Sequence, residues 1–471
     1  MSANAPEQPQ PDNGDTGSLY EKHKTIHART AHGRFANWRI FLVLFTQLLF
    51  YGTPWLMWND RQAVLFHLVE RKFYIFGLVL WPQDVFYLAI LLIISAYGLF
   101  LVTAVAGRLF CGYACPQTVY TEVFMWIENW IEGDRPARMK LEKAPMDARK
   151  LRIKATKHAL WLILSVFTGF TLVGYFTPMS ELLTELKTFS FGPWETFWTF
   201  FYGGFTYMMA GFMREQVCKY MCPYARFQSV MFDPDTLIIT YDPERGEPRG
   251  TRKKGADPKA LGLGECVDCG ICVQVCPTGI DIRNGLQYEC IGCAACIDAC
   301  DEVMDKVNYP RGLIRYSTEN AMARHLTKKE ILGHVVRPRI LLYSVILAAI
   351  TLTTAWFIAH RIPLKVDVIR DRGALARETD MGLIENTFTL RFMNTDEQAH
   401  RYRIKATGLD GLEVGGAAEV DVPAATTTSL MTSLQVQPDA GKKGSNPIIF
   451  EIEAMDGSNI RIREKAVFML P

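Results

Sequence analysis

The chain has 471 residues and a formal net charge of +2, because 51 Lys and Arg nearly balance 49 Asp and Glu. This balance lacks the basic excess of nucleic-acid-binding proteins, so we exclude nucleic acid as a partner. The length corresponds to about two to four domains. Twelve cysteines are present, and all of them fall into four short, regularly spaced patterns. Because every cysteine belongs to one of these patterns, we predict reduced thiols that bind thiophilic metals or carry electrons.

The chain begins with a polar stretch rich in Pro, Asn and Gly that becomes basic before the first apolar segment, and we expect residues 1–38 to form a disordered tail. No cleavable signal peptide is apparent in this stretch. Five apolar windows then approach the ~20 residues that cross a ~30 Å hydrocarbon core. The last window carries no charge, and the fourth is the weakest because Glu195 and Gly203-Gly204 interrupt it. The windows are 40–58, 85–106, 158–177, 195–213 and 340–359.

Positive charge predicts the orientation of these spans. The tail and the segment 107–157 are rich in Lys and Arg, whereas 59–84 and 178–194 carry few. The positive-inside rule therefore places the N-terminus, 107–157 and 214–339 in the cytoplasm and 360–471 outside. Aromatic and cationic residues in 59–84 fit an interfacial belt or a re-entrant stretch. Every cysteine falls on the cytoplasmic side, where structural disulfides do not persist, which favours metal ligation.

Two similar motifs end the second and fourth spans. They are Cys111-x-x-x-Cys115-Pro116 and Cys218-x-x-x-Cys222-Pro223, each preceded by an arginine, and they look like an internal repeat. Cysteines at i and i+4 lie on one face of a helix, and the proline ends or restarts that helix. We expect the two pairs to converge on one site of two to four thiolates at the membrane surface.

The chemistry of this site has three candidate forms. Thiolates with nearby methionines favour copper(I), which is the first interpretation. A reversible dithiol that passes electrons is the second. A further iron–sulfur or haem site is the third, although haem is disfavoured because the spans hold no facing histidines.

Two longer runs resemble the bacterial two-cluster ferredoxins. In that pattern three cysteines of one run hold one [4Fe–4S] cluster and the fourth crosses to the other cluster. Zinc sites are the less specific alternative for Cys-x-x-Cys pairs. The expected ligands are Cys266, Cys269, Cys272 and Cys300 for the first cluster, and Cys276, Cys290, Cys293 and Cys296 for the second.

The last segment changes character. Alternating apolar and polar residues at roughly ten-residue intervals, separated by Gly, Asp, Asn and Pro turns, predict an antiparallel sandwich of about seven strands with an immunoglobulin-like fold. The segment has no cysteine and suits a scaffold or a partner-docking surface. The predicted divisions are a tail, a four-span membrane domain, a ferredoxin-like domain, a fifth span and the sandwich: 1–38, 39–240, 241–325, 326–362 and 363–471.

These motifs together resemble the CcoG/FixG/RdxA family of accessory proteins for cbb3-type cytochrome c oxidase assembly. The stretches beginning at Pro54, Arg61 and Arg71 share the resemblance, which covers nearly the whole chain. It implies a multi-pass protein of the bacterial inner membrane with a periplasmic sandwich. It also implies reduction of copper(II) to copper(I) for the oxidase, with oxidase subunits, assembly factors and a copper-exporting ATPase as partners.

Two other functions fit the same residues. One is an electron-transfer subunit resembling the membrane polyferredoxins of nitrate and nitrous oxide respiration, which share both kinds of cysteine motif. The other is an iron–sulfur scaffold or redox sensor without catalytic activity. In the first interpretation Cys111, Cys115, Cys218 and Cys222 bind copper or relay electrons to it. Each interpretation requires an electron donor or partner that the sequence does not identify.

Overall fold

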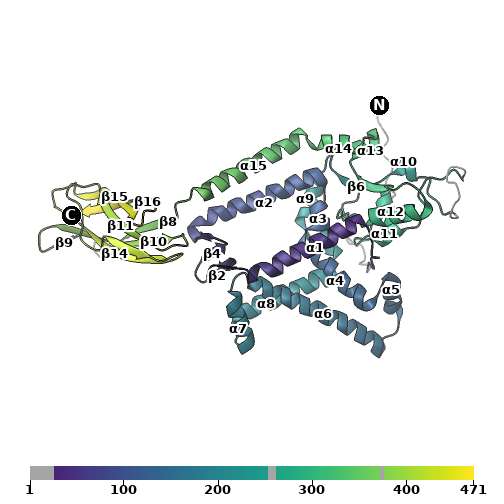
Figure 1. The fold of residues 1–471 in the computed structure, drawn as a ribbon, viewed down its shortest axis with the longest axis horizontal. Helices are drawn as coiled ribbons and strands as arrows, with labels where there is room; N and C mark the ends of the chain where they lie inside the picture. The colour runs from purple at the N-terminus through teal and green to yellow at the C-terminus, as the bar shows by residue number, and fades with distance from the viewer. Residues whose placement is uncertain (1–25, 253–260, 372–375) are drawn as a thin grey trace, which may run out of the picture.

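A computed structural model describes residues 26–252, 261–371 and 376–471 of the chain. The molecule is elongated (Figure 1). A β-sandwich occupies one end, the cysteine-rich region occupies the other, and long helices run between them. The predicted tail 1–38 lies outside the described residues up to position 25. Residues 26–33 form an irregular segment, and the first helix begins at Arg34.

Within the described residues, four helices are long and apolar enough to cross a membrane. They correspond to four of the five predicted windows. Only a minority of the residues in these helices are buried, as expected for helices whose apolar faces meet lipid. These helices are α1 (Arg34–Gly52), α2 (Val85–Ala106), α6 (Ala148–Val173) and α15 (Pro338–Ala359).

The fourth window, 195–213, folds as two consecutive segments, α8 (Pro193–Thr206) and the π-helix η3 (Tyr207–Met213). Gly203 does not interrupt the helix, although the sequence suggested an interruption there. A Cβ at Gly203 would lie 3.1 Å from the carbonyl oxygen of Ser165, and one at Gly169 would overlap Thr199. Small residues thus let α6 and α8 approach closely, as at many helix interfaces in membranes. A fifth crossing stays a prediction.

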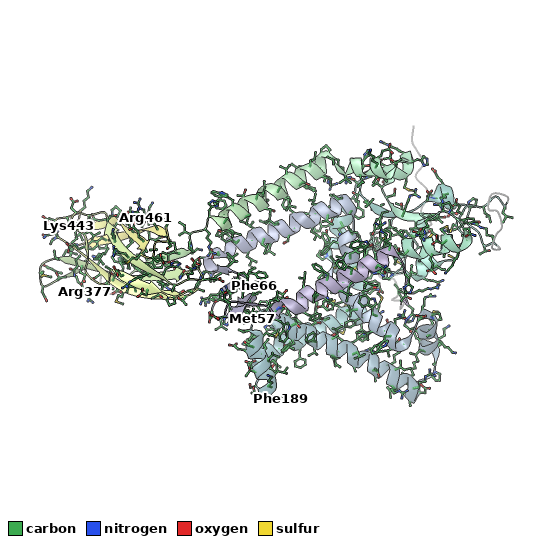
Figure 2. All side chains as sticks on the ribbon, in the orientation of Figure 1. Met57, Phe66, Phe189, Arg377, Lys443 and Arg461 are labelled. Atoms are coloured by element: carbon green, nitrogen blue, oxygen red, sulfur yellow. The ribbon has the colours of Figure 1, made fainter. Side chains whose placement is uncertain are left out.

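The segment between α1 and α2 folds into short strands. The pair β1 (Met57–Trp58) and β2 (Arg61–Gln62) precedes a three-stranded antiparallel sheet of β3 (Val64–His67), β4 (Lys72–Ile75) and β5 (Leu78–Leu80). The 3-10 turns η1 (Thr53–Trp55) and η2 (Pro82–Asp84) join this unit to the helices. Figure 2 shows Met57 and Phe66 between the helices and the sandwich, and Phe189 beyond helix α7 (Met179–Thr188).

At the opposite end, short helices and one small sheet surround the cysteines. The strands β6 (Ile238–Tyr241) and β7 (Ile314–Ser317) pair antiparallel and bracket the cysteine-rich segment. The remaining elements here are α3 (Leu109–Tyr113), α4 (Pro116–Glu132), α5 (Arg135–Lys143), η4 (Val217–Met221), α9 (Pro223–Met231), α10 (Pro243–Gly246), α11 (Ile271–Gln274), η6 (Ile282–Asn284), α12 (Ala295–Val307), α13 (Glu319–Arg324) and α14 (Lys328–Val335).

The C-terminal segment forms two antiparallel sheets, in agreement with its period-two pattern. The first has the strand order β12-β14-β10-β8 with β9 beside β10, and the second has the order β13-β11-β15-β16. Phe388, Phe450 and Phe468 fill the space between the sheets, while Lys443 and Arg461 lie on the outer surface (Figure 2). The strands are β8 (Leu364–Arg370), β9 (Arg377–Glu378), β10 (Ile384–Asn394), β11 (His400–Thr407), β12 (Glu413–Val414), β13 (Glu419–Val422), β14 (Thr427–Val436), β15 (Gly444–Ala454) and β16 (Arg461–Leu470).

Ion pairs attach this sandwich to the helices. Asp84, at the start of α2, is buried and pairs with Arg361 just after α15 (2.6 Å) and with Lys365 of β8. Glu397 of the sandwich pairs with Arg61 (2.7 Å). Because a buried carboxylate with two cationic partners is costly to separate from them, these contacts hold the sandwich against the ends of the apolar helices.

His400 provides a pH-dependent contact in the sandwich. Its buried ring bonds Asp396 (3.1 Å) and Asp456. Burial lowers the pKa of His400, but the hydrogen bonds to Asp456 and Asp396 outweigh that effect and raise it above 6.5. The raised pKa stabilises the fold fully below pH 6.5, and this contribution is lost as the pH rises through the folded-state value.

We therefore expect amide exchange in β11 of the full-length protein to become faster as the pH rises from 6.5, after correction for intrinsic exchange. His400→Gln should remove that dependence. Equal pH profiles for the two proteins would contradict this assignment.

Candidate functional site

The first cysteine pair spans a break between two helices. Cys111 lies in the short helix α3, and Cys115 is the residue that precedes the first turn of α4. Pro116 occupies that first turn, where its missing N–H is not needed. The two cysteines therefore do not share one continuous helix face, as the i, i+4 spacing suggested, because the chain restarts its helix between them.

The second pair repeats this design. Cys218 lies in the π-helix η4, Cys222 precedes α9, and Pro223 begins that helix. Both Cys115 and Cys222 thus sit at helix N-termini, where unpaired backbone N–H groups favour a thiolate. The backbone amides of Gln117 and Thr118 lower the pKa of Cys115, although burial raises it more.

The fold brings the four thiols together, as the repeated motif predicted. Cys218 is close enough to Cys111, Cys115 and Cys222 for a charge on any of them to raise its pKa. Burial is the larger cause, and the pKa reaches about 12 for Cys218 and about 11 for Cys111. Cys111 and Cys218 are therefore protonated at neutral pH when no metal is bound, and a metal must displace their protons when it binds. We call these four residues the tetracysteine site.

Side chains from several elements hold the tetracysteine site in place. The Cys111 thiol donates to Oε1 of buried Gln228 in α9 (3.3 Å), and the Thr118 hydroxyl donates to the Cys111 carbonyl (2.5 Å). Gln117 of α4 donates to the carbonyls of Met209 (2.9 Å) and Arg214 (3.1 Å) just before η4. These bonds connect each cysteine motif to the segment that carries the other.

The eight ferredoxin-type cysteines line two small cavities. One cavity is lined by Cys266, Cys269, Cys272 and Cys300, and the other by Cys276, Cys290, Cys293 and Cys296, with Cys272 lining both. These are the two sets that the spacing predicted, with the fourth cysteine of each run crossing to the other set. Gly270, Gly279 and Gly292 all have positive φ, as tight loops around a cluster require. The residues present fit two iron–sulfur clusters.

The tetracysteine site packs directly against the loop of the second cavity. A Cβ at Gly112 would lie 2.9 Å from the Cys293 backbone, and one at Gly292 would lie 3.1 Å from the Arg108 carbonyl. Two glycines therefore interlock α3 with this loop. Cys111 and Cys218 also contact the apolar group that includes Cys293.

Arg108 was not singled out as a site residue by the sequence, although it begins the repeated motif. Its buried guanidinium donates to the Ala225 carbonyl (2.6 Å) and to that of Tyr288. Burial raises the pKa of Cys111 and Cys218 in one site and of Cys290 in the other, and the Arg108 charge opposes that rise in both sites. One buried cation thus serves both groups of thiolates.

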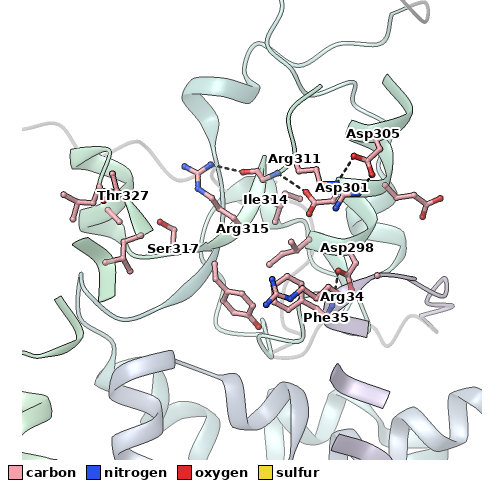
Figure 3. A pocket seen from close by; sticks show the side chains of 18 of the residues that line it. Arg34, Phe35, Asp298, Asp301, Asp305, Arg311, Ile314, Arg315, Ser317 and Thr327 are labelled. Atoms are coloured by element: carbon pink, nitrogen blue, oxygen red, sulfur yellow. Dashed lines mark hydrogen bonds and ion pairs between the residues drawn. The ribbon is translucent and has the colours of Figure 1, made fainter. Parts of the chain in front are cut away.

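The first apolar helix is attached to the same region. Asp298 of α12 accepts hydrogen bonds from the backbone amides of Phe35 (3.2 Å) and Ala36 (2.7 Å), so it caps the N-terminus of α1. Figure 3 shows Asp298 beside Arg34 and Phe35, in a cavity of about 950 Å³ that also contains Asp301, Arg311 and Arg315. The cysteine-rich region is therefore tied to the apolar helices.

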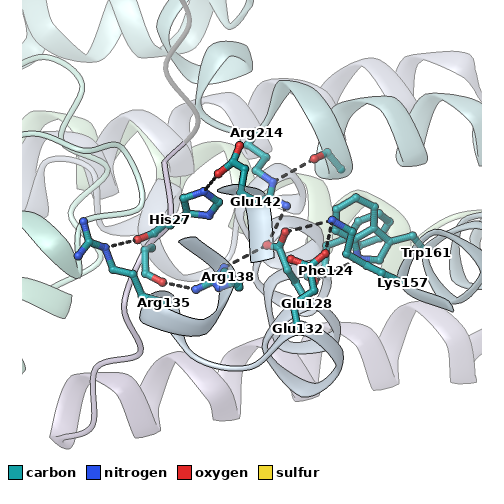
Figure 4. Close-up of polar contacts among 12 residues, drawn as sticks. His27, Phe124, Glu128, Glu132, Arg135, Arg138, Glu142, Lys157, Trp161 and Arg214 are labelled. Atoms are coloured by element: carbon teal, nitrogen blue, oxygen red, sulfur yellow. Dashed lines mark hydrogen bonds and ion pairs between the residues drawn. The ribbon is translucent and has the colours of Figure 1, made fainter. Parts of the chain in front are cut away.

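A buried ion network supports the second cysteine motif (Figure 4). Glu128 of α4 pairs with Arg138 (3.2 Å), Lys157 (3.4 Å) and Arg214 (3.1 Å). Arg214 lies between η3 and η4 and has φ +39°, a conformation that L residues rarely adopt. The network thus fixes the backbone turn that leads to Cys218.

Three family models match the chain. A "4Fe-4S dicluster domain" matches residues 213–319, a "4Fe-4S binding domain" matches 88–136, and the "IG-like fold at C-terminal of FixG" matches 354–471. The matches support iron–sulfur clusters and the immunoglobulin-like sandwich.

Three curated proteins are similar over most of their length. RdxB of Cereibacter sphaeroides is 40% identical over 88% of this chain and 89% of its own. Nitrogen fixation protein FixG of Rhizobium meliloti is 37% identical over 90% of this chain and 86% of its own. RdxA of C. sphaeroides is 38% identical over 91% of this chain and 92% of its own. Together with the apolar helices, these similarities indicate a membrane iron–sulfur protein that transfers electrons.

Proposed function

Because this chain belongs to the CcoG/FixG/RdxA family of membrane iron–sulfur proteins, we propose that it reduces copper(II) to copper(I) and supplies the product for assembly of a cbb3-type cytochrome c oxidase. The observation that carries this proposal is the tetracysteine site, which is packed against the second ferredoxin-type cavity.

The reaction balances as a one-electron transfer. Clusters bound in the two cavities supply single electrons at low potential. Copper(II) accepts one electron and becomes copper(I), while the reduced protein is oxidised by one electron and no proton is required. A one-electron carrier of the cytoplasm restores the reduced protein. Soft sulfur ligands favour copper(I) over copper(II), and the exposed Met221 thioether beside the tetracysteine site is one such ligand.

The residues of the tetracysteine site have a defined task in this proposal. They relay the electron towards copper. Arg108 stabilises negative charge both in the tetracysteine site and in the second ferredoxin-type cavity. Gly112 and Gly292 keep the two sites in direct backbone contact. The sandwich, on the other side of the membrane in the proposed topology, offers a surface to oxidase assembly factors and to a copper-exporting ATPase.

The test uses full-length protein in detergent, reduced and freed of excess reductant under anaerobic conditions. Addition of copper(II) should oxidise the clusters and yield about one copper(I) for each reduced cluster, followed with a copper(I) chelator. A Cys111→Ser, Cys218→Ser variant should retain its ferredoxin-type clusters and lose rapid copper(I) formation. Met431→Ser, which removes an exposed sulfur from the sandwich, is the control that should behave as the parent.

Two results would contradict the proposal. Clusters that stay reduced in the presence of copper(II) would indicate an electron carrier for another acceptor. Unchanged copper(I) formation in the double variant would remove the tetracysteine site from the reaction.

A further inference from the structure

We propose that the tetracysteine site holds a third [4Fe–4S] cluster, with Cys111, Cys115, Cys218 and Cys222 as its ligands. The inference deepens the proposed function and rests on it in one respect: the third cluster would be the centre from which copper(II) takes its electron. Copper is then the substrate of this site and not its resident metal.

The arrangement of the four thiols favours a cluster over a single ion. One tetrahedral ion with metal–sulfur bonds of about 2.3 Å requires its sulfurs to lie within about 4 Å of one another. Within residues 26–252, 261–371 and 376–471, no three His, Cys, Asp or Glu side chains are arranged to hold one metal ion. The same is true of the eight ferredoxin-type cysteines, which are the expected ligands of the other two clusters.

Two buried N–H groups beside the site have no hydrogen-bond partner within the described residues. They are Nε2 of Gln228, whose side chain is fully buried, and Nε of Arg108, which is 6% exposed. An unpaired buried donor costs about 1–3 kcal/mol. Gln228 already contacts Cys111 through Oε1, and a turn of its amide would direct Nε2 at a metal-bound thiolate. Iron–sulfur centres use such N–H donors, because hydrogen bonds to their sulfurs help set the potential.

The negative charge of the four thiolates also favours a cluster over a single copper(I) ion. Four half-buried thiolates are costly without positive charge. A copper(I) ion carries one charge, whereas a cluster core carries more and spreads it over several atoms. The helix N-termini at Cys115 and Cys222 and the Arg108 guanidinium supply the remaining compensation.

The family match over residues 88–136 is an independent observation. This "4Fe-4S binding domain" contains Cys111 and Cys115 and none of the eight ferredoxin-type cysteines. The site also adjoins the Cys293 loop through Gly112, so the three groups of thiols form one continuous series.

Iron and acid-labile sulfide analysis of anaerobically purified full-length protein tests the inference. We expect about 12 irons per chain in the parent and about 8 in a variant with all four tetracysteine residues changed to alanine. About 8 irons in both proteins, with or without bound copper, would overturn it.

A second measurement applies if the fourfold variant fails to fold. Gln228→Leu keeps all four thiols and removes the amide, and it should move the midpoint potential of one electron paramagnetic resonance signal to a more negative value. Thr278→Val is the matched variant, since the Thr278 hydroxyl lies 3.2 Å from the thiol of Cys276 at another site. It should shift a different signal. If Gln228→Leu shifts the same signal as Thr278→Val, or none, the third cluster is excluded.

The two proposals can fail separately. Twelve irons without copper(I) formation would leave the third cluster intact and remove the reductase. Eight irons with normal copper(I) formation would exclude the third cluster and leave the reductase proposal intact.

Discussion

Replacing Glu128 by glutamine is expected to destabilise the helical region around α4 and α6 by about 3–5 kcal/mol. Glu128 is 5% exposed and neutralises Arg138, Lys157 and Arg214. Glutamine keeps the shape but leaves these three cations with less compensating charge in a buried position. The measurement is hydrogen exchange of α4 and α6 in the full-length protein, which reports the free energy of local opening.

The control for this substitution is Glu302→Gln on α12, where the pair with Lys306 is exposed on both sides. An exposed pair at i, i+4 contributes only about 0.3–0.5 kcal/mol, so little change is expected. Equal effects of the two substitutions would show that the buried network is not a major source of stability.

The ion pairs of Glu128 also make the stability of this helical region depend on pH in the acid range. Burial raises the pKa of Glu128, but Arg214, Lys157 and Arg138 together hold it below its usual 4.5. A lowered carboxyl pKa means that the stabilisation is present above pH 4.5 and is lost as the pH falls through the folded-state value. The parent should therefore lose protection of α4 in acid, and Glu128→Gln should lose less.

Gly112→Ala is expected to separate the tetracysteine site from the Cys293 loop. The new Cβ would lie 2.9 Å from the Cα and backbone N of Cys293, a contact that only a backbone shift can relieve. Overpacking of this kind costs about 1–3 kcal/mol. Since a misplacement of about 1 Å at a reacting site can cost on the order of 10²-fold, copper(I) formation should also slow markedly.

Gly98→Ala in α2 is the matched control, because a Cβ there meets no atom within 4 Å. It should leave stability and copper(I) formation unchanged. Stopped-flow measurement of cluster oxidation distinguishes the two parts of the prediction: slower oxidation with full iron content indicates a disturbed interlock. Normal rates in Gly112→Ala would mean that electrons do not cross there.

Glu128 and Gly112 have different roles: one stabilises the fold around the site, and the other affects electron transfer between the groups of thiols. Glu128 acts on Arg214 and hence on the turn before Cys218, whereas Gly112 sets the distance between two groups of thiols. Slower copper(I) formation with intact iron content is expected only from substitution of Gly112.

Much of the site could be predicted from local sequence. The spacing of Cys266 to Cys300 predicted two sets of four cysteines because a cluster requires three ligands in one tight loop, and the two cavities contain those sets. Charge-free windows of sufficient length identified four of the apolar helices for a similar reason, since length and composition are local properties. The alternating pattern likewise anticipated the sandwich.

Other features depend on contacts between distant residues. The strands β1 to β5 were missed because short, aromatic-rich strands have no pattern that separates them from an interfacial loop. Gly203 looked like an interruption, yet together with Gly169 it lets α8 pack closely on α6. Gln228 gave no signal, because nothing near it in the chain indicates that it meets Cys111.

The sequence by itself thus predicted the ligand sets of the two ferredoxin-type sites, because the eight cysteines follow a regular spacing between Cys266 and Cys300. It also determined that two further cysteine pairs exist. Only the tertiary structure decided that these pairs face one another and adjoin the Cys293 loop, since that arrangement depends on where α3, α4 and α9 pack. The physical reason is that the spacing of ligands within one loop is local, whereas the proximity of two sites is set by the packing of residues far apart in the chain.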